Sequence, residues 1–204
     1  MAHLYDYKPL DTTKKEIRLM RLLPAQNWQD EVVISLKTVS FLDTEPVTFE
    51  ALSYVWGSSD TPKKVTIHET GAVVHATRNL LEALRQLRSE TNAQSPWMWI
   101  DAICVNQQNL TERSEQVQSM ASIYTRATKV IAWLGPHDHD SNLALDCLDD
   151  IAKHVTFDDH TTRFHAKTSD LSWVQNELSS IDEVQAAAII RFFQRSCKCD
   201  LEAF

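Results

Sequence analysis

Short runs of apolar residues predict strands along the first third of the chain. Continuous or alternating apolar side chains over about four to eight residues are typical of strands. The predicted strands are residues 16–22, 32–39 and 50–56, followed by a hairpin of residues 65–68 and 72–75 around Gly71. The strand at 50–56 stops at Gly57, where turn-forming residues follow.

Helical spacing begins after Thr77, a residue that can cap a helix. Apolar side chains at Leu80, Leu84 and Leu87 lie on one face of this predicted helix. Trp97–Val105 is almost continuously apolar and carries a single charge, Asp101, which predicts a strand buried on both faces.

Asn109 can cap the next helix, and Glu112 stands at the capping-box position. The predicted buried stripe of that helix is Val117, Met120, Ile123, Tyr124 and Ala127. The later predicted elements are a strand at 129–134, a helix at 143–153 with Leu145, Leu148 and Ile151 inward, a polar connection at 154–180 and a helix at 181–195. Because strands and helices alternate from residue 50 onward, the pattern predicts an α/β fold whose parallel sheet has helices on both faces.

Composition excludes several classes of protein. The chain has 204 residues and a formal net charge of −8, so a broad nucleic-acid surface is not expected. No apolar run is long enough to span a bilayer, and the amino end lacks the apolar core of a signal peptide. We therefore expect a cytoplasmic protein with no membrane span, whose four cysteines are free thiols.

The three glycines, Gly57, Gly71 and Gly135, lie too far apart for the phosphate-binding loops of nucleotide hydrolases or dinucleotide-binding folds. No Gly-x-Ser-x-Gly elbow is present, so a serine hydrolase is not expected. The run His137–Asp140 has metal-ligating side chains but no distant partners, and we interpret it as a solvated turn and expect no metal site. Cys104 has no histidine partner in the pattern, which predicts a buried, inert thiol.

Asp101 is the leading candidate for a functional residue. An isolated charge in an apolar strand is costly to bury unless it is paired. At the carboxyl end of a parallel strand it would face the crevice where ligands bind, and the alternative is a structural role, such as pairing with Arg113. Asn106 and Gln107 follow the same strand and either contact a ligand or shape the turn.

The end of the strand at 50–56 offers a second group of candidates. Trp56 either stacks on a flat ring or closes the core, and Ser53 and Gly57 lie beside it. Glu112 either caps its helix or directs its carboxylate into the cleft.

Several ordered motifs resemble those of the fungal heterokaryon-incompatibility (HET) family. Residues 49–57, including Ser53, Tyr54, Trp56 and Gly57, are similar to the first signature of the family. Residues 99–107, with Asp101, Asn106 and Gln107, are similar to the second. Glu112, Arg113 and Gln116 continue the pattern, and the similarity covers roughly residues 5–150.

The resemblance implies a module that promotes programmed cell death on non-self recognition, acting by contact with a protein partner or by self-association. HET domains in turn resemble TIR domains, a flavodoxin-like α/β fold, some of which cleave NAD with a glutamate on the helix after the third strand. Here the corresponding helix, 143–153, carries Asp146, Asp149 and Asp150 but no glutamate. The alternative function that this resemblance implies is an assembly-activated NAD glycohydrolase that uses Asp101 and Asp146, with NAD as substrate and no bound cofactor. The missing glutamate favours the contact mechanism.

The resemblance also suggests how the chain is divided. We expect N-terminal strands at 1–48, a core α/β domain at 49–153, and a polar connection with a C-terminal helix at 154–204. After Phe192 and Phe193 the sequence departs from the family pattern, which leaves open a truncated chain or residues from a mis-joined gene model.

Overall fold

The computed structural model describes residues 3–43, 47–58, 60–89, 95–158, 161, 163–167 and 181–195. The described residues form two compact units, one ending at Gly135 and the other running from Pro136 to Arg195. No helix among the described residues is long and apolar enough to cross a membrane.

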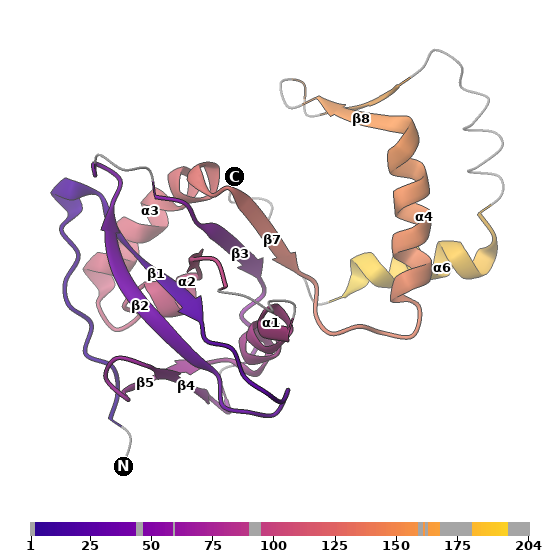
Figure 1. Cartoon of the computed structure of the whole chain (residues 1–204). Helices are drawn as coiled ribbons and strands as arrows, with labels where there is room; N and C mark the ends of the chain where they lie inside the picture. The colour runs from indigo at the N-terminus through magenta and orange to yellow at the C-terminus, as the bar shows by residue number, and fades with distance from the viewer. Residues whose placement is uncertain are drawn as a thin grey trace. The chain divides into compact units, whose positions relative to one another are not determined.

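A mixed sheet in the order β5-β4-β2-β1-β6-β3-β7 forms the centre of the first unit (Figure 1). Its strands are β1 Glu16–Leu22, β2 Val33–Ser40, β3 Glu50–Tyr54, β4 Lys63–Ile67, β5 Val73–Ala76, β6 Met98–Trp99 and β7 Lys129–Trp133. Strands β2, β4, β6, β3 and β7 run in one direction, whereas β1 and β5 run in the other. The α/β class is confirmed, but the sheet is mixed, because β1 lies in its middle and pairs antiparallel with both neighbours.

The predicted strand Trp97–Val105 is wrong over most of its length. Only Met98–Trp99 is a strand, and after Ile100 the chain turns into a short helix, α2, at Asp101–Cys104. The amides of Ile103 and Cys104 donate to the Ile100 carbonyl and close this turn. Ile103 and Cys104 are fully buried, and an apolar run cannot by itself distinguish a buried strand from a buried helical turn.

The longer helices of this unit are α1, Arg78–Ser89, and α3, Leu110–Arg126. The predicted caps are confirmed: the Thr77 hydroxyl accepts from the Leu80 amide, and the Asn109 side chain accepts from the amides of Thr111 and Glu112. Two expectations for α3 fail. Val117 is 58 % exposed, and Glu112 does not complete a capping box, because its carboxylate is engaged elsewhere.

A buried ion pair joins β1 to the first turn of α3. Arg18 Nη1 and Nη2 lie 2.5 and 3.1 Å from the two carboxylate oxygens of Glu112, and both side chains are almost completely buried. Arg18 also donates to the carbonyls of Cys104 and Lys8, and Glu112 accepts from the Asn106 amide. The pair therefore fixes α2, the following loop and the N-terminal segment against the sheet.

The second unit contains α4, Ser141–His154, α6, Glu183–Gln194, and a hairpin of β8, Val155–Asp158, and β9, Arg163–Ala166. Part of the predicted polar connection at 154–180 is therefore a hairpin, and residues 168–180 lie outside the described residues. α4 packs against α6 through Ala144, Cys147 and Ala188, which are buried, but Leu145, predicted to face inward, is 48 % exposed. Asp182 and Gln185 form a capping box at the start of α6.

Breaking the buried ion pair is expected to destabilise the first unit strongly. Arg18→Met leaves the Glu112 carboxylate buried without its charged partner, which should lower the free energy of unfolding by about 3–5 kcal/mol. Combining Arg18→Met with Glu112→Leu should recover much of this loss, because no unpaired charge remains. Urea denaturation followed by circular dichroism measures both effects.

The control is the exposed pair of Arg78 and Glu82 on α1. Arg78→Gln removes the same charge from an exposed pair, and we expect a loss of less than about 1 kcal/mol. Equal losses for Arg18→Met and Arg78→Gln would contradict a structural role for the buried pair.

Candidate functional site

Three parallel strands bring their carboxyl ends to one rim of the sheet. β3 pairs in parallel with both β6 and β7, so the residues that follow Tyr54, Trp99 and Trp133 share this rim. Trp56, after β3, donates from its indole Nε1 to the Asp101 carboxylate at 2.7 Å, after β6. Two groups of candidate residues thus meet at one rim, although Asp101 belongs to the helical turn α2 and not to a strand.

Burial governs the chemistry of Asp101. Its carboxylate accepts from the Ala102 amide at 2.7 Å as well as from Trp56, and both bonds favour the ionised form. Desolvation outweighs them and raises the pKa of Asp101 above its ordinary value. Tyr54 lies in the same environment, where burial and the Asp101 charge raise the pKa of its phenol. A carboxyl group of this kind is suited to functional chemistry, although structural networks perturb pKa values too.

Trp56 stands at the surface with 43 % of its area exposed, so the alternative in which it closes the core is wrong. Gly57 follows with φ of +71°, a conformation that favours glycine. Asn79 of α1 supports this loop, because its amide donates to the Val55 carbonyl and accepts from the Trp133 indole. The exposed indole is therefore held on a braced loop next to a buried carboxyl group.

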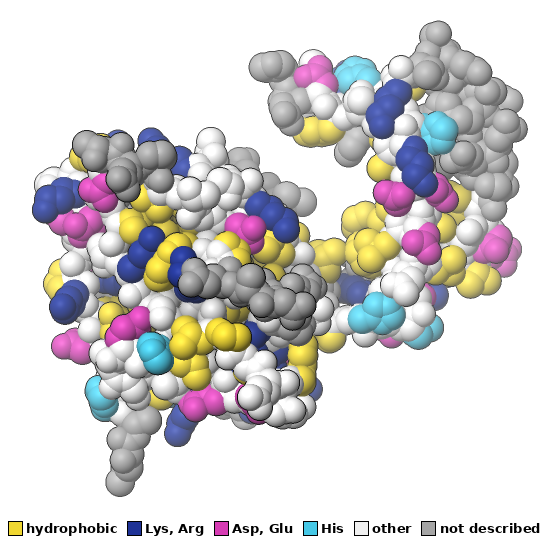
Figure 2. Space-filling view, viewed as in Figure 1, with side chains coloured by type: hydrophobic (Ala, Val, Ile, Leu, Met, Phe, Trp, Pro, Cys, Tyr) yellow, Lys and Arg dark blue, Asp and Glu magenta, His cyan; other side chains and the backbone are white. Residues whose placement is uncertain are grey.

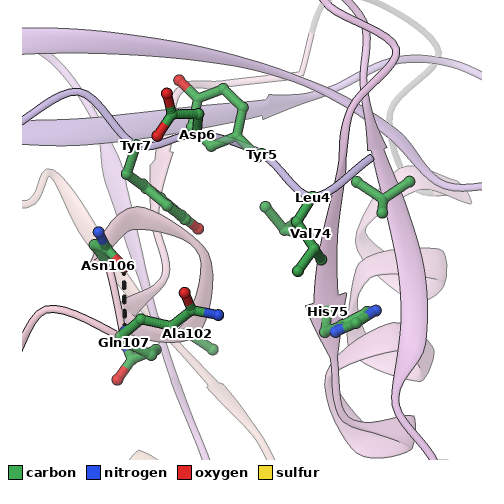
Figure 3. A pocket seen from close by; sticks show the side chains of 11 residues that line it. Leu4, Tyr5, Asp6, Tyr7, Val74, His75, Ala102, Asn106 and Gln107 are labelled. Atoms are coloured by element: carbon green, nitrogen blue, oxygen red, sulfur yellow. Dashed lines mark hydrogen bonds between the residues drawn. The ribbon is translucent and has the colours of Figure 1, made fainter. Parts of the chain in front are cut away.

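A pocket of about 190 Å³ opens on another side of α2 (Figure 3). Its walls are residues 4–7 of the N-terminal segment, residues 73–75 of β5, Ala102 and residues 106–108. Figure 3 shows Asn106 and Gln107 on one side and Val74 and His75 on the other. Asn106 and Gln107 thus line a pocket, and they also shape the turn: Asn106 accepts from the Gln108 amide, and Gln107 donates to the Asp101 carbonyl. These bonds show the turn-shaping role, and contact with a ligand stays a prediction.

The other candidates lie away from the rim. Glu112 is committed to Arg18, and Gln116 is buried with its amide donating to the Glu16 carbonyl, so both hold the fold together. Arg113 is exposed on α3 and forms no ion pair with Asp101, whose side-chain partner is Trp56. Ser53 is half-buried on β3 and interacts with neighbouring residues.

Asp146 belongs to the second unit and is exposed on α4, as are Asp149 and Asp150, which pair with Lys153. Asp101 and Asp146 therefore belong to different units.

Two further expectations concern thiol and metal chemistry. Cys104 is fully buried, and burial raises the pKa of its thiol to about 12, which agrees with an inert side chain. The run Asp138–Asp140 is more than a solvated turn, because Asp140 is buried and pairs with Arg191 and Arg195 of the second unit.

The residues that position the site have little signal of their own in the sequence. Arg18 shares its predicted strand with Glu16 and Arg21, so its charge does not stand out from the pattern as the single charge of Asp101 does. Tyr7, whose hydroxyl donates to the Ile103 carbonyl at 2.8 Å, and Asn79 carried no such signal, because their partners are far away in the sequence.

Comparisons with known proteins agree with the motifs at this rim. The family model described as heterokaryon incompatibility protein (HET) matches residues 49–193. The chain is 33 % identical over 172 residues to heterokaryon incompatibility protein 6, OR allele, of Neurospora crassa; the match covers 79 % of this chain and 25 % of that relative. The chain thus spans about a quarter of the length of the curated relative that it matches. No solved structure matches. The chain belongs to the heterokaryon-incompatibility (HET) family.

Proposed function

We propose that this chain acts in fungal heterokaryon incompatibility as a signalling module that promotes cell death on non-self recognition, through contact with another protein chain. Its kinship to heterokaryon incompatibility protein 6 of Neurospora crassa supports the role. The observation that carries the contact mechanism is an apolar stripe on the exposed face of α3.

The stripe consists of Leu110 and Val117, which are 69 % and 58 % exposed, with Ser114 and Ala121 at the intervening helical positions. Residues at i, i+4, i+7 and i+11 line one side of a helix. Small side chains at Ser114 and Ala121 leave room for the close approach of a second helix. Val117 belongs to the run of family motifs yet contributes little to the core, because most of its surface is exposed.

A second copy of this chain is the occupant that we propose for the stripe. The same face on two copies is self-complementary around a two-fold axis, the commonest symmetry of protein assemblies. Apolar residues gain from mutual burial whichever chain supplies them. Self-association would thereby bring further copies of the rim together in one assembly.

Val117→Asp is expected to weaken self-association of the purified chain at high concentration, because a charge would have to be buried at the contact. Gln118→Asp is the matched control: it adds the same charge at the next exposed position of the same helix. Sedimentation velocity and light scattering measure the oligomers. Equal effects of both substitutions, or a wild-type chain that stays monomeric at all concentrations, would reject the stripe as a self-association surface.

The biological role is tested by expressing the chain in a filamentous fungus and scoring growth arrest and loss of viability. We expect wild type and Gln118→Asp to reduce viability and Val117→Asp to restore it. Normal growth with all chains, at matched protein levels, would contradict the proposed death-promoting activity.

A second candidate function is cleavage of NAD at the nicotinamide bond, and the pairing of Asp101 with Trp56 favours it. A buried carboxyl group with a raised pKa beside a half-exposed indole could contact the developing positive charge and the flat ring of such a substrate. In this proposal the carboxylate form of Asp101 stabilises the transition state.

Incubation of the purified chain with NAD, with a crowding agent to favour assembly, should release nicotinamide, which chromatography detects. Because burial raises the pKa of Asp101, its carboxylate form appears at a higher pH than that of an ordinary aspartate. The rate should therefore rise with pH through this shifted range, and Asp101→Asn should remove both the rate and the rise. If the wild-type chain releases no nicotinamide, this candidate function is eliminated, and the proposed contact function is unaffected.

A further inference from the structure

Two cations share one indole on the face of the sheet opposite the buried ion pair. The Arg21 guanidinium carbon lies 4.3 Å from the centre of the Trp97 ring, and Lys37 Nζ lies 4.2 Å from it. Both distances are within the range of cation–π contacts. The three side chains are half-buried, and we call them the cationic patch.

Strand register places the patch on one face. The antiparallel pairing of Met20 with Met98 sets residue 97 beside Arg21, and Lys37 pairs with Leu19. Leu19, Arg21 and Lys37 therefore point to the same side, whereas Arg18 points to the other side, toward Glu112 of α3. In Figure 1, α2 and α3 lie behind β1 and β2, and Figure 2 shows Lys and Arg side chains beside hydrophobic ones over these strands.

A role in covering the core explains why an indole stands at position 97, but it does not explain the positive charges of Arg21 and Lys37. Leu19 is fully buried beneath this face, so a large side chain above it stabilises the fold. Neither Arg21 nor Lys37 forms an ion pair or a side-chain hydrogen bond with any residue that the structure describes, and Arg21 Nε is buried without an acceptor. Burial and the nearby Arg21 charge lower the pKa of Lys37, which shows that the two cations repel each other. A chain with a net charge of −8 has many carboxylates that could have paired with them.

From this geometry we propose that Arg21, Lys37 and Trp97 form a docking site for an acidic segment of a partner protein. A carboxylate placed between the cations would accept from the unused N–H groups of Arg21 and from the Lys37 ammonium. It would also relieve the repulsion between them, and the indole offers an apolar surface for the neighbouring methylene groups. This inference rests on the proposed contact function and adds the chemistry of a partner to it. Because the cationic patch and the α3 stripe are different surfaces, either proposal can fail without the other.

The test uses the full chain and a fluorescein-labelled peptide of alternating glutamate and glycine, with a glutamine–glycine peptide as the uncharged probe. Fluorescence anisotropy should show binding of the glutamate peptide alone, weakening as salt is raised. The combined change Arg21→Gln and Lys37→Gln should weaken this binding by about tenfold or more, because both anion contacts are lost. Lys37→Met keeps the packing of the methylene chain and should weaken peptide binding less than the double change does. This single variant controls for a folding defect in the double variant.

Lys63→Gln with Lys64→Gln is the matched control, because it removes the same charge from β4 and leaves the cationic patch intact. This control should bind the glutamate peptide as wild type does. Equal weakening in both double variants would show diffuse attraction instead of a site, and no binding by wild type would overturn the proposal. Tighter binding of a single-stranded oligonucleotide would reassign the patch to nucleic acid. Loss of self-association in the patch variant without peptide binding would assign it to a second copy.

Discussion

The ion pair between Arg18 and Glu112 is the interaction on which the first unit depends. A guanidinium and a carboxylate buried together are stable only if each has its partner and its remaining hydrogen bonds. Here the carbonyls of Lys8 and Cys104 and the amide of Asn106 complete the set. Segments far apart in the sequence thus meet at one point and are held in one geometry.

This geometry controls both candidate features next to α2. Asp101 opens α2 and Cys104 closes it, and the Cys104 carbonyl accepts from Arg18. On the rim, Asp101 meets the indole of Trp56. On the other side, Asn106 and Gln107 line the pocket with Tyr7, whose ring lies under the Arg18 guanidinium. One charged pair in the interior therefore sets the position of two surface features.

The exposed surfaces suggest a division of labour between faces. The α3 stripe is apolar and nearly uncharged, and it suits a second copy of the same chain. The cationic patch lies on the opposite face of the sheet from Glu112, and it suits a partner that supplies carboxylates. In the two proposals, one surface serves assembly and the other serves recognition of a partner.

The sequence by itself determined the local elements and the family. Apolar runs located most strands, and Thr77 and Asn109 identified helix starts, because caps and periodicity act within a few residues. The pattern also identified Trp56 and Asp101 as candidates, and the fold brings them together on one rim. The tertiary structure alone decided the rest. The apolar run after Trp99 fits a buried strand and a buried helical turn equally well, so only the folded structure shows that it is a turn. The place of β1 in the middle of the sheet depends on long-range strand pairing, which local patterns do not predict. Glu112 pairs with Arg18 and does not complete a capping box, because a charge-assisted hydrogen bond to a guanidinium is stronger than one to a backbone amide.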